Sequence, residues 1–149
     1  MWLVGFLIEA ISDQQKLQFK KYSTNIERWC NIGFWKWSCH PNYFGEILLW
    51  WWVFVASKPL LEGAKWLAVT GPIFLTALLL FLSGIPLLEY SADKKFGGLT
   101  EYREYKRKTS PLVLLPPTVY GRLPDRFKQV LLLEFPFYSR KLYGEKTLN

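Results

Sequence analysis

An uncharged run in the middle of the chain limits its possible folds more than any other feature. Residues Trp66 to Leu88, WLAVTGPIFLTALLLFLSGIPLL, contain no charged side chain. A helix of this length spans about 34 Å at about 1.5 Å per residue, enough to cross the hydrocarbon core of a bilayer with some tilt. Pro72 and the Gly84–Pro86 stretch would bend or end a helix in water, but membrane helices tolerate such residues. The run therefore predicts a transmembrane helix.

A second apolar run lies shortly before the first in the sequence. Residues Tyr43 to Ser57 carry Glu46 as their only charge, and Ser38 or Asn42 is the expected N-cap of this helix. Lys58 to Lys65 form a polar link between the two runs. Two apolar helices joined by so short a link predict a membrane hairpin, and thus an all-α integral membrane protein.

The distribution of positive charge predicts how this hairpin is oriented. The formal net charge is +7, and only Lys58 and Lys65 of the 19 basic residues lie in the hairpin turn. The positive-inside rule then places the opposite ends of both helices, with His40, on the cytosolic side. A multi-pass protein is expected, and an endoplasmic reticulum membrane and a bacterial inner membrane are equally compatible with this pattern.

The flanking segments are more polar. Residues 1–22 read as the end of a helix that leads into the domain, and EYREYKRKTS, residues 101–110, predicts a short cytosolic helix. Its basic residues are best explained by attraction to anionic lipid, so membrane lipids are expected partners and nucleic acid is not. Residues 118–149 predict an interfacial basic and apolar tail, because the apolar segment Val130–Phe137 is too short to cross a membrane.

Two polar motifs are candidates for binding. SCHPNYFGE, from Ser38 to Glu46, opens the first apolar helix, where free N–H groups could receive a phosphate or a ribose. On the residues alone, a simple capping loop is the favoured reading. DQQKLQFKK, from Asp13 to Lys21, presents Lys16 and Lys20 at helical spacing, either to a phosphorylated ligand or as a basic collar at a helix end.

Other classes of site find little support. Cys30 and Cys39, with one histidine, lack the spacing of a zinc site, so no bound metal is expected. No GxGxxG follows a strand pattern, which argues against a Rossmann domain.

The motifs in their order resemble a known membrane family. GFWKWSCHPNYFGE, SGIPLLE and EYREYKRKTSP are similar to the C-terminal domain of steroid 5-alpha-reductase-like proteins, and the similarity extends over residues 13–117. Sterol C14 reductases and isoprenylcysteine carboxyl methyltransferases share this architecture. In all three groups the C-terminal helices and cytosolic loops hold a nucleotide-type cofactor, which is NADPH in the reductases and S-adenosylmethionine in the methyltransferases.

The resemblance implies the C-terminal, cofactor-binding half of an oxidoreductase that reduces a C=C bond of a lipid or sterol-like substrate with NADPH. It implies catalytic roles for Tyr43 and Glu46, with Tyr43 as proton donor. The residues that it implies at the cofactor are Lys16, Lys20, Trp35, His40, Asn42, Tyr43, Glu46, Glu89, Tyr102, Tyr105 and Lys106.

The chain departs from the family pattern in two ways. Cys39 stands where family members usually carry arginine, which should weaken a phosphate or carboxylate contact. The family also has several membrane helices before the position of Asp13, and these helices, which supply much of the lipid-substrate cavity, are expected to be missing here. A methyltransferase relative and a truncated, non-catalytic membrane paralogue or subunit are the alternatives that remain open.

Overall fold

The computed structural model describes residues 1–124 and 128, which are mostly helical (74%) and contain no strand. The α-helices are α1 (Trp2–Lys21), α2 (Pro41–Ser57), α3 (Thr70–Ala77), α4 (Ile85–Phe96), α5 (Thr100–Lys108) and α6 (Pro117–Tyr120). Shorter helical turns are η1 (Ser23–Asn25), η2 (Gly33–Lys36), η3 (Lys58–Leu60), η4 (Gly63–Val69) and the π-helical η5 (Leu78–Leu82). The predicted tail segment Val130–Phe137 lies outside the described residues.

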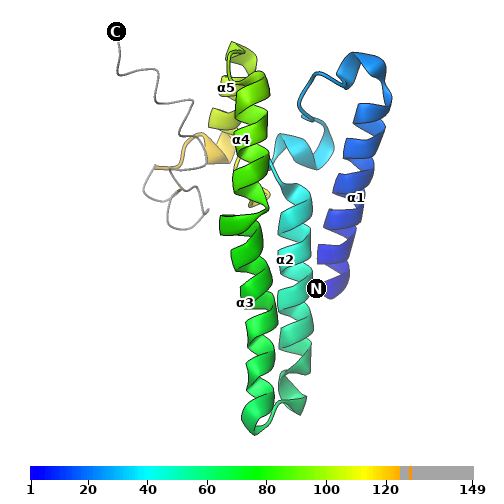
Figure 1. Cartoon of the computed structure of the whole chain (residues 1–149), viewed down its shortest axis with the longest axis vertical. Helices are drawn as coiled ribbons and strands as arrows, with labels where there is room; N and C mark the ends of the chain where they lie inside the picture. Colours follow the sequence, from blue (N-terminus) through cyan, green and yellow to red (C-terminus); the bar gives the residue numbers. More distant parts are fainter. Residues whose placement is uncertain (125–127, 129–149) are drawn as a thin grey trace.

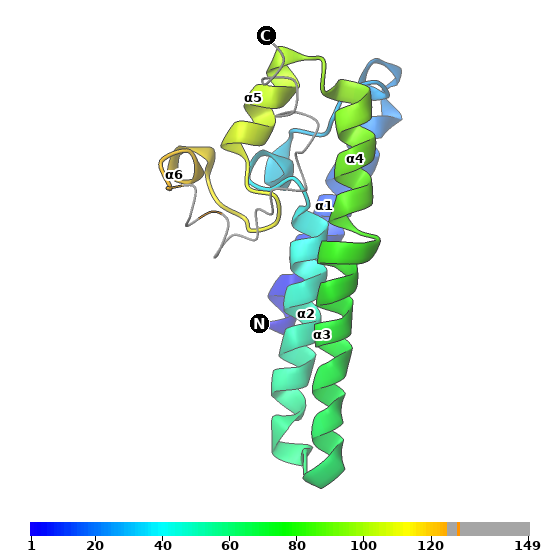
Figure 2. The ribbon, with the colours of Figure 1, turned by 60° about the vertical axis from the view of Figure 1, so that its left-hand side comes forward.

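The centre of the molecule is a helical hairpin. Helix α2 is followed, after the short link at residues 58–62, by a helical rod that runs from Gly63 to Phe96 and includes η4, α3, η5 and α4. Helices α2 and α3 lie side by side in both views (Figure 1, Figure 2). The rod is the one helix of the described part that is long and apolar enough to cross a membrane. The prediction of a mainly helical chain is therefore confirmed, and the predicted run over 66–88 lies in a helix that is long and apolar enough to cross a membrane.

Helix α1 packs against α2 through two glycines. A Cβ atom on Gly5 would lie 2.8 Å from the carbonyl oxygen of Gly45, and one on Gly45 would lie 2.6 Å from the backbone nitrogen of Glu9. Ordinary side chains therefore cannot occupy these positions without moving the helices apart. Small residues at helix crossings are a common way for membrane helices to approach closely.

The rod is interrupted where α4 begins. Gly84 lies against the backbone of Leu79, leaving no room for a Cβ atom, and Pro86 occupies the first turn of α4. The buried side chains of Leu80, Ile85 and Leu112 form an apolar cluster at this level. The interruption separates the apolar part of the rod from α4, which carries the charged side chains of the site.

The loop before α2 is held by the segment after α5. The backbone N–H of Cys39 donates to the carbonyl oxygen of Ser110 at 2.8 Å, and Ser38 Oγ donates to that of Leu112 at 2.7 Å. The prediction that Ser38 or Asn42 caps α2 is wrong. The N-cap residue is His40, and no side chain hydrogen-bonds the free N–H groups of the helix. Ser38 is already engaged with Leu112 and with the N–H of His40. These bonds bring α5 over the end of the hairpin that is opposite the 58–62 link (Figure 2).

Candidate functional site

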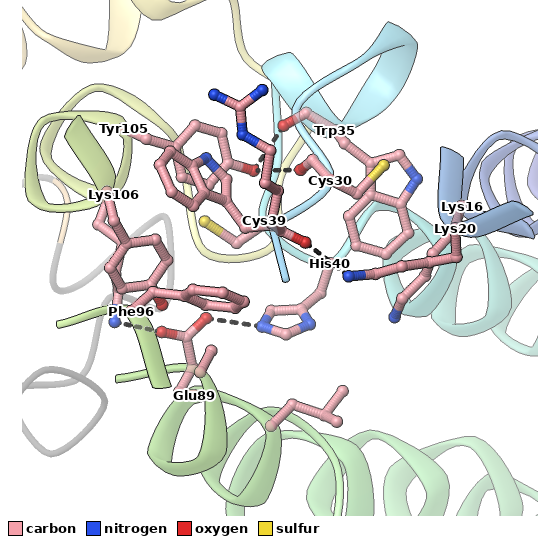
Figure 3. A pocket seen from close by; sticks show the side chains of 15 residues that line it. Lys16, Lys20, Cys30, Trp35, Cys39, His40, Glu89, Phe96, Tyr105 and Lys106 are labelled. Atoms are coloured by element: carbon pink, nitrogen blue, oxygen red, sulfur yellow. Dashed lines mark hydrogen bonds and ion pairs between the residues drawn. The ribbon is translucent and has the colours of Figure 1, made fainter. Parts of the chain in front are cut away.

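A cavity of about 170 Å³ lies at this end of the hairpin, between α1, the loop before α2, α4 and α5 (Figure 3). Segments far apart in the sequence meet here. Eight of the residues that the resemblance implies at a cofactor line this one cavity: Lys16, Lys20, Trp35, His40, Glu89, Tyr102, Tyr105 and Lys106.

A buried ionic network forms one wall. His40 Nε2 lies 2.8 Å from Glu89 Oε1, and Lys106 forms ion pairs with Glu89 Oε2 and, at 2.8 Å, with Asp93 Oδ1. The hydroxyl of Tyr102 donates to Asp93 Oδ1 at 3.1 Å. Burial alone would lower the pKa of Lys106, but Glu89 and Asp93 outweigh it and raise the pKa above its usual value. The ammonium therefore stays charged and links α5 to α4.

Aromatic rings form the other walls. The Trp29 ring meets Tyr102 and Phe96 edge-on, with centroids 5.3 and 5.8 Å apart. The Tyr105 hydroxyl donates to the carbonyl oxygen of Trp35 at 2.6 Å, which fixes both residues. Burial raises the pKa of Tyr102 and Tyr105, so both phenols stay neutral. Flat apolar walls with few polar groups suit a planar ring.

Two lysines enter the cavity from α1 and differ in what they can bind. Lys20 Nζ donates to the carbonyl oxygens of Asn25, Ile26 and Arg28 at 3.2, 3.1 and 2.5 Å. An ammonium has three N–H groups, so these contacts use all its donors to hold the loop. Lys16 Nζ instead lies 4.7 Å above the Trp35 ring. Of the two predicted phosphate ligands, Lys16 is thus the one whose N–H groups are not already used by the loop carbonyls.

Both cysteines line the cavity. Burial, followed by the charge of Glu89, raises the pKa of Cys39, and burial also raises the pKa of Cys30. Both thiols are therefore neutral near pH 7, and position 39 brings no positive charge to the wall. In the described part of the chain no three His, Cys, Asp or Glu side chains are grouped so as to hold a metal ion.

Three predicted residues on α2 do not line the cavity: Asn42, Tyr43 and Glu46. The Tyr43 ring stacks on His40 with centroids 5.7 Å apart and packs against the apolar cluster of Leu80, Ile85 and Leu112. Glu46 follows Gly45, the residue that contacts α1, and interacts electrostatically with Asp13 and Glu9 of α1. The first turns of α2 thus direct both predicted catalytic side chains to helix contacts, and Tyr43 reaches the cavity only through His40.

The cavity also contains residues that the sequence did not reveal. Asp93 completes the ionic network one helical turn after Glu89, and this i, i+4 spacing was a usable signal. Trp29 and Arg28 come from a loop whose path depends on the Lys20 contacts, so no local pattern marked them. Two side-chain atoms at the cavity, His40 Nδ1 and Trp29 Nε1, are buried and have no hydrogen-bond partner among the described residues.

Comparison with known proteins gives a family for most of this structure. The family model described as Protein of unknown function (DUF1295) matches residues 1–109, which include every cavity residue discussed above. No curated protein and no solved structure gives a significant match. The chain belongs to the DUF1295 family, which is associated with steroid 5-alpha-reductase-like proteins.

Proposed function

We propose that the chain is the cofactor-binding part of a membrane oxidoreductase that uses NADPH to reduce a C=C bond of a lipid or sterol-like substrate. The observation that carries this proposal is the single cavity shared by Lys16, Trp35, His40 and Glu89. It combines a cation for phosphate, a flat wall for a ring and a buried hydrogen-bonded pair. The association of the family with steroid 5-alpha-reductase-like proteins supports the same reading.

The residues present fit one end of a dinucleotide. Pockets for drug-sized ligands enclose about 300–1,000 Å³. The cavity is smaller, at about 170 Å³, so it suits the nicotinamide end, with the rest of the cofactor lying across its mouth. Lys16 and the exposed Arg28 supply cations for phosphates.

Bound NADPH would supply the hydride that reduces the C=C bond. The chain's own residues position the cofactor and control protons. Lys106 fixes Glu89, and Glu89 in turn fixes the ring of His40. Aromatic rings line much of the cavity. The second carbon of the double bond needs a proton. Tyr43, the proposed donor, does not line the cavity, so it can protonate only a substrate that binds beside His40 outside the cavity.

The membrane arrangement is part of the proposal. We place α2 and the Gly63–Phe96 rod across the bilayer, with the cavity on the cytosolic side and the 58–62 link on the other. Helix α2 is about 25 Å long, close to the thickness of the hydrocarbon core. The exposed side chains of Arg107 and Lys108 on α5 would then face anionic lipid headgroups.

Ligand-dependent stability tests the choice of cofactor. NADPH at 100 times its Kd should stabilise the detergent-purified chain by about 2.7 kcal/mol, which raises its melting temperature, whereas S-adenosylmethionine should not. A Lys16→Gln variant should shift less with NADPH at the same concentration. A shift with S-adenosylmethionine alone would favour the methyltransferase alternative, and no shift with either ligand would favour a non-catalytic membrane subunit.

A further inference from the structure

Trp29 is shared by three hollows on one side of the molecule. It lines the cavity of about 170 Å³, a groove of about 400 Å³ along α5, and a smaller hollow of about 110 Å³ that Phe19 of α1 also lines. The far side of the groove is formed by Lys36, Lys108 and Pro117. A ring that lines all three hollows separates them, so its displacement would join the cavity to the groove.

Trp29 ends a segment that is fastened to α1. In this segment, residues 22–29, here named the strap, most side chains are exposed. The backbone of the strap is held by Lys20, whose Nζ donates to three of its carbonyl oxygens, and the Asn25 side-chain amide donates to the carbonyl oxygen of Phe19 at 3.1 Å. A segment that buries so little apolar surface of its own can open locally while α1 stays folded.

Toward α4 and α5 the strap is held by the Trp29 ring. The ring contacts three aromatic side chains, with centroids 5.3, 5.8 and 6.2 Å away: Tyr102, Phe96 and Tyr105. Phe96 belongs to α4 and the two tyrosines to α5. Aromatic pairs of this kind stabilise a contact beyond the area that they bury. The Trp29 ring therefore connects the strap to the opposite wall of the cavity.

Two features oppose this closed arrangement. Trp29 Nε1 is buried and finds no hydrogen-bond acceptor among the described residues, so its donor would gain a partner from water if the ring moved out. Lys20 of α1 and Lys95 of α4 both donate to the carbonyl oxygen of Ile26, at 3.1 and 3.4 Å, so two ammonium groups repel each other across the strap. The closed strap thus depends on its aromatic contacts.

We propose that the strap is the entrance to the cavity and that the Trp29 ring is its latch. When the ring leaves its three aromatic neighbours, the cavity joins the groove along α5, whose volume lies in the range of about 300–1,000 Å³ that is usual for ligand sites. A ligand then enters from the side of Phe96 and Tyr105, which lies opposite Lys16 in Figure 3. The inference applies to any ligand of the cavity and does not require NADPH.

The reactivity of Cys30 measures this opening in the wild-type chain. Cys30 follows the latch, lines the cavity and is 8% exposed. Its reaction with N-ethylmaleimide in detergent, at about pH 8, can be followed by peptide mass spectrometry, which separates it from Cys39. We expect the rate to depend weakly on urea, because local opening exposes little surface. A rate with the steep urea dependence of global unfolding would overturn the proposal, and this measurement needs no variant.

Variants assign the opening to the latch. Trp29→Ala should make Cys30 react about tenfold faster than in the wild type, because the loss of one aromatic pair already accounts for about this factor. Phe96→Ala removes a ring on the other side of the same contact and should act in the same direction. Trp37→Ala is the matched control, because Trp37 is exposed and does not line the cavity, and it should leave the rate unchanged.

The double variant distinguishes a latch from simple loosening next to Cys30. If the two rings form one contact, Trp29→Ala combined with Phe96→Ala should accelerate the reaction less than the product of the two single effects. Effects that multiply independently, or a Trp29→Ala rate equal to that of Trp37→Ala, would overturn the assignment. NADPH is absent from all these measurements, so their outcome is independent of the proposed function, which the ligand-dependent stability tests separately.

Discussion

Lys106 is the cation that allows two carboxylates to be buried beside the cavity. Its ammonium is shared between Glu89 and Asp93, and the three side chains are only 9%, 6% and 4% exposed. Removing one partner from a buried ion pair leaves an uncompensated charge in a medium that solvates it poorly. The orientation of the His40 ring depends on this network, since Glu89 is the one described side chain that hydrogen-bonds the ring.

Substituting Lys106 should therefore affect both stability and the site. We expect Lys106→Met to destabilise the fold by about 3–5 kcal/mol, seen as a lower melting temperature in detergent. Lys108→Met is the matched control, because Lys108 pairs with Glu104 on the exposed face of the same helix. Equal melting temperatures for the two variants would show that the buried network does not hold α5 in place.

At this scale the sequence predicted which side chains lie together better than it predicted their contacts. Eight of the implied cofactor residues meet in one cavity because α1, the segment before α2, α4 and α5 fold together. Two features depended on tertiary structure. The engagement of Lys20 by three carbonyl groups follows from the path of the loop, and the absence of Glu46 from the cavity lining depends on how α2 packs against its neighbours. Neither can be read from local spacing.

Among the elements, the contact between α1 and α2 decides whether the Lys16 side of the cavity is formed. The helices approach through Gly5 and Gly45, and Lys16 and Trp35 meet two to three turns further along α1. Trp35 Nε1 also donates to the carbonyl oxygen of Ser12 at 2.9 Å, which ties the loop before α2 to α1. Separating α1 from α2 would therefore widen the cavity on the side lined by Lys16.

Gly45→Ala tests this contact. The added Cβ would lie 2.7 Å from the carbonyl oxygen of Gly5, closer than packed atoms allow. We expect a loss of about 1–3 kcal/mol in the free energy of unfolding, the usual cost of overpacking. Gly71→Ala is the control, because its Cβ meets no atom within 4 Å and alanine is the better helix former. A destabilised Gly71→Ala with an unchanged Gly45→Ala would contradict this account of the packing.

The helices themselves were the most predictable elements. The length of the uncharged run over 66–88 predicted the rod, and the short polar link after α2 predicted the turn of the hairpin. The start of α2 was less predictable: Ser38 is a good N-cap residue, but its hydroxyl bonds Leu112 from the segment after α5. Such long-range competition for a side chain leaves no signal in the local pattern. The predicted tail at residues 118–149 lies largely outside the described residues.

For the whole molecule, the central question is which face of the membrane the cavity occupies. The 58–62 link and α5 lie at opposite ends of the hairpin (Figure 1). If both hairpin helices cross the bilayer, single cysteines at Glu62→Cys and Lys108→Cys should react with a membrane-impermeant reagent from opposite sides. The native thiols should react slowly, since burial raises the pKa of Cys30 and Cys39. Labelling of both introduced cysteines from one side would exclude a hairpin that spans the membrane.

Energy transfer between tryptophan and a reduced nicotinamide tests the central claim most directly, because Trp29 and Trp35 line the cavity. We expect NADPH to quench tryptophan emission and to gain emission of its own, saturating below about 1 mM, the upper end of usual cofactor and substrate affinities. Lys16→Gln should shift the saturation to higher concentration, and S-adenosylmethionine should leave the tryptophan emission unchanged. The absence of saturable energy transfer to NADPH in the folded wild-type chain would contradict the assignment of this cavity to a nicotinamide cofactor.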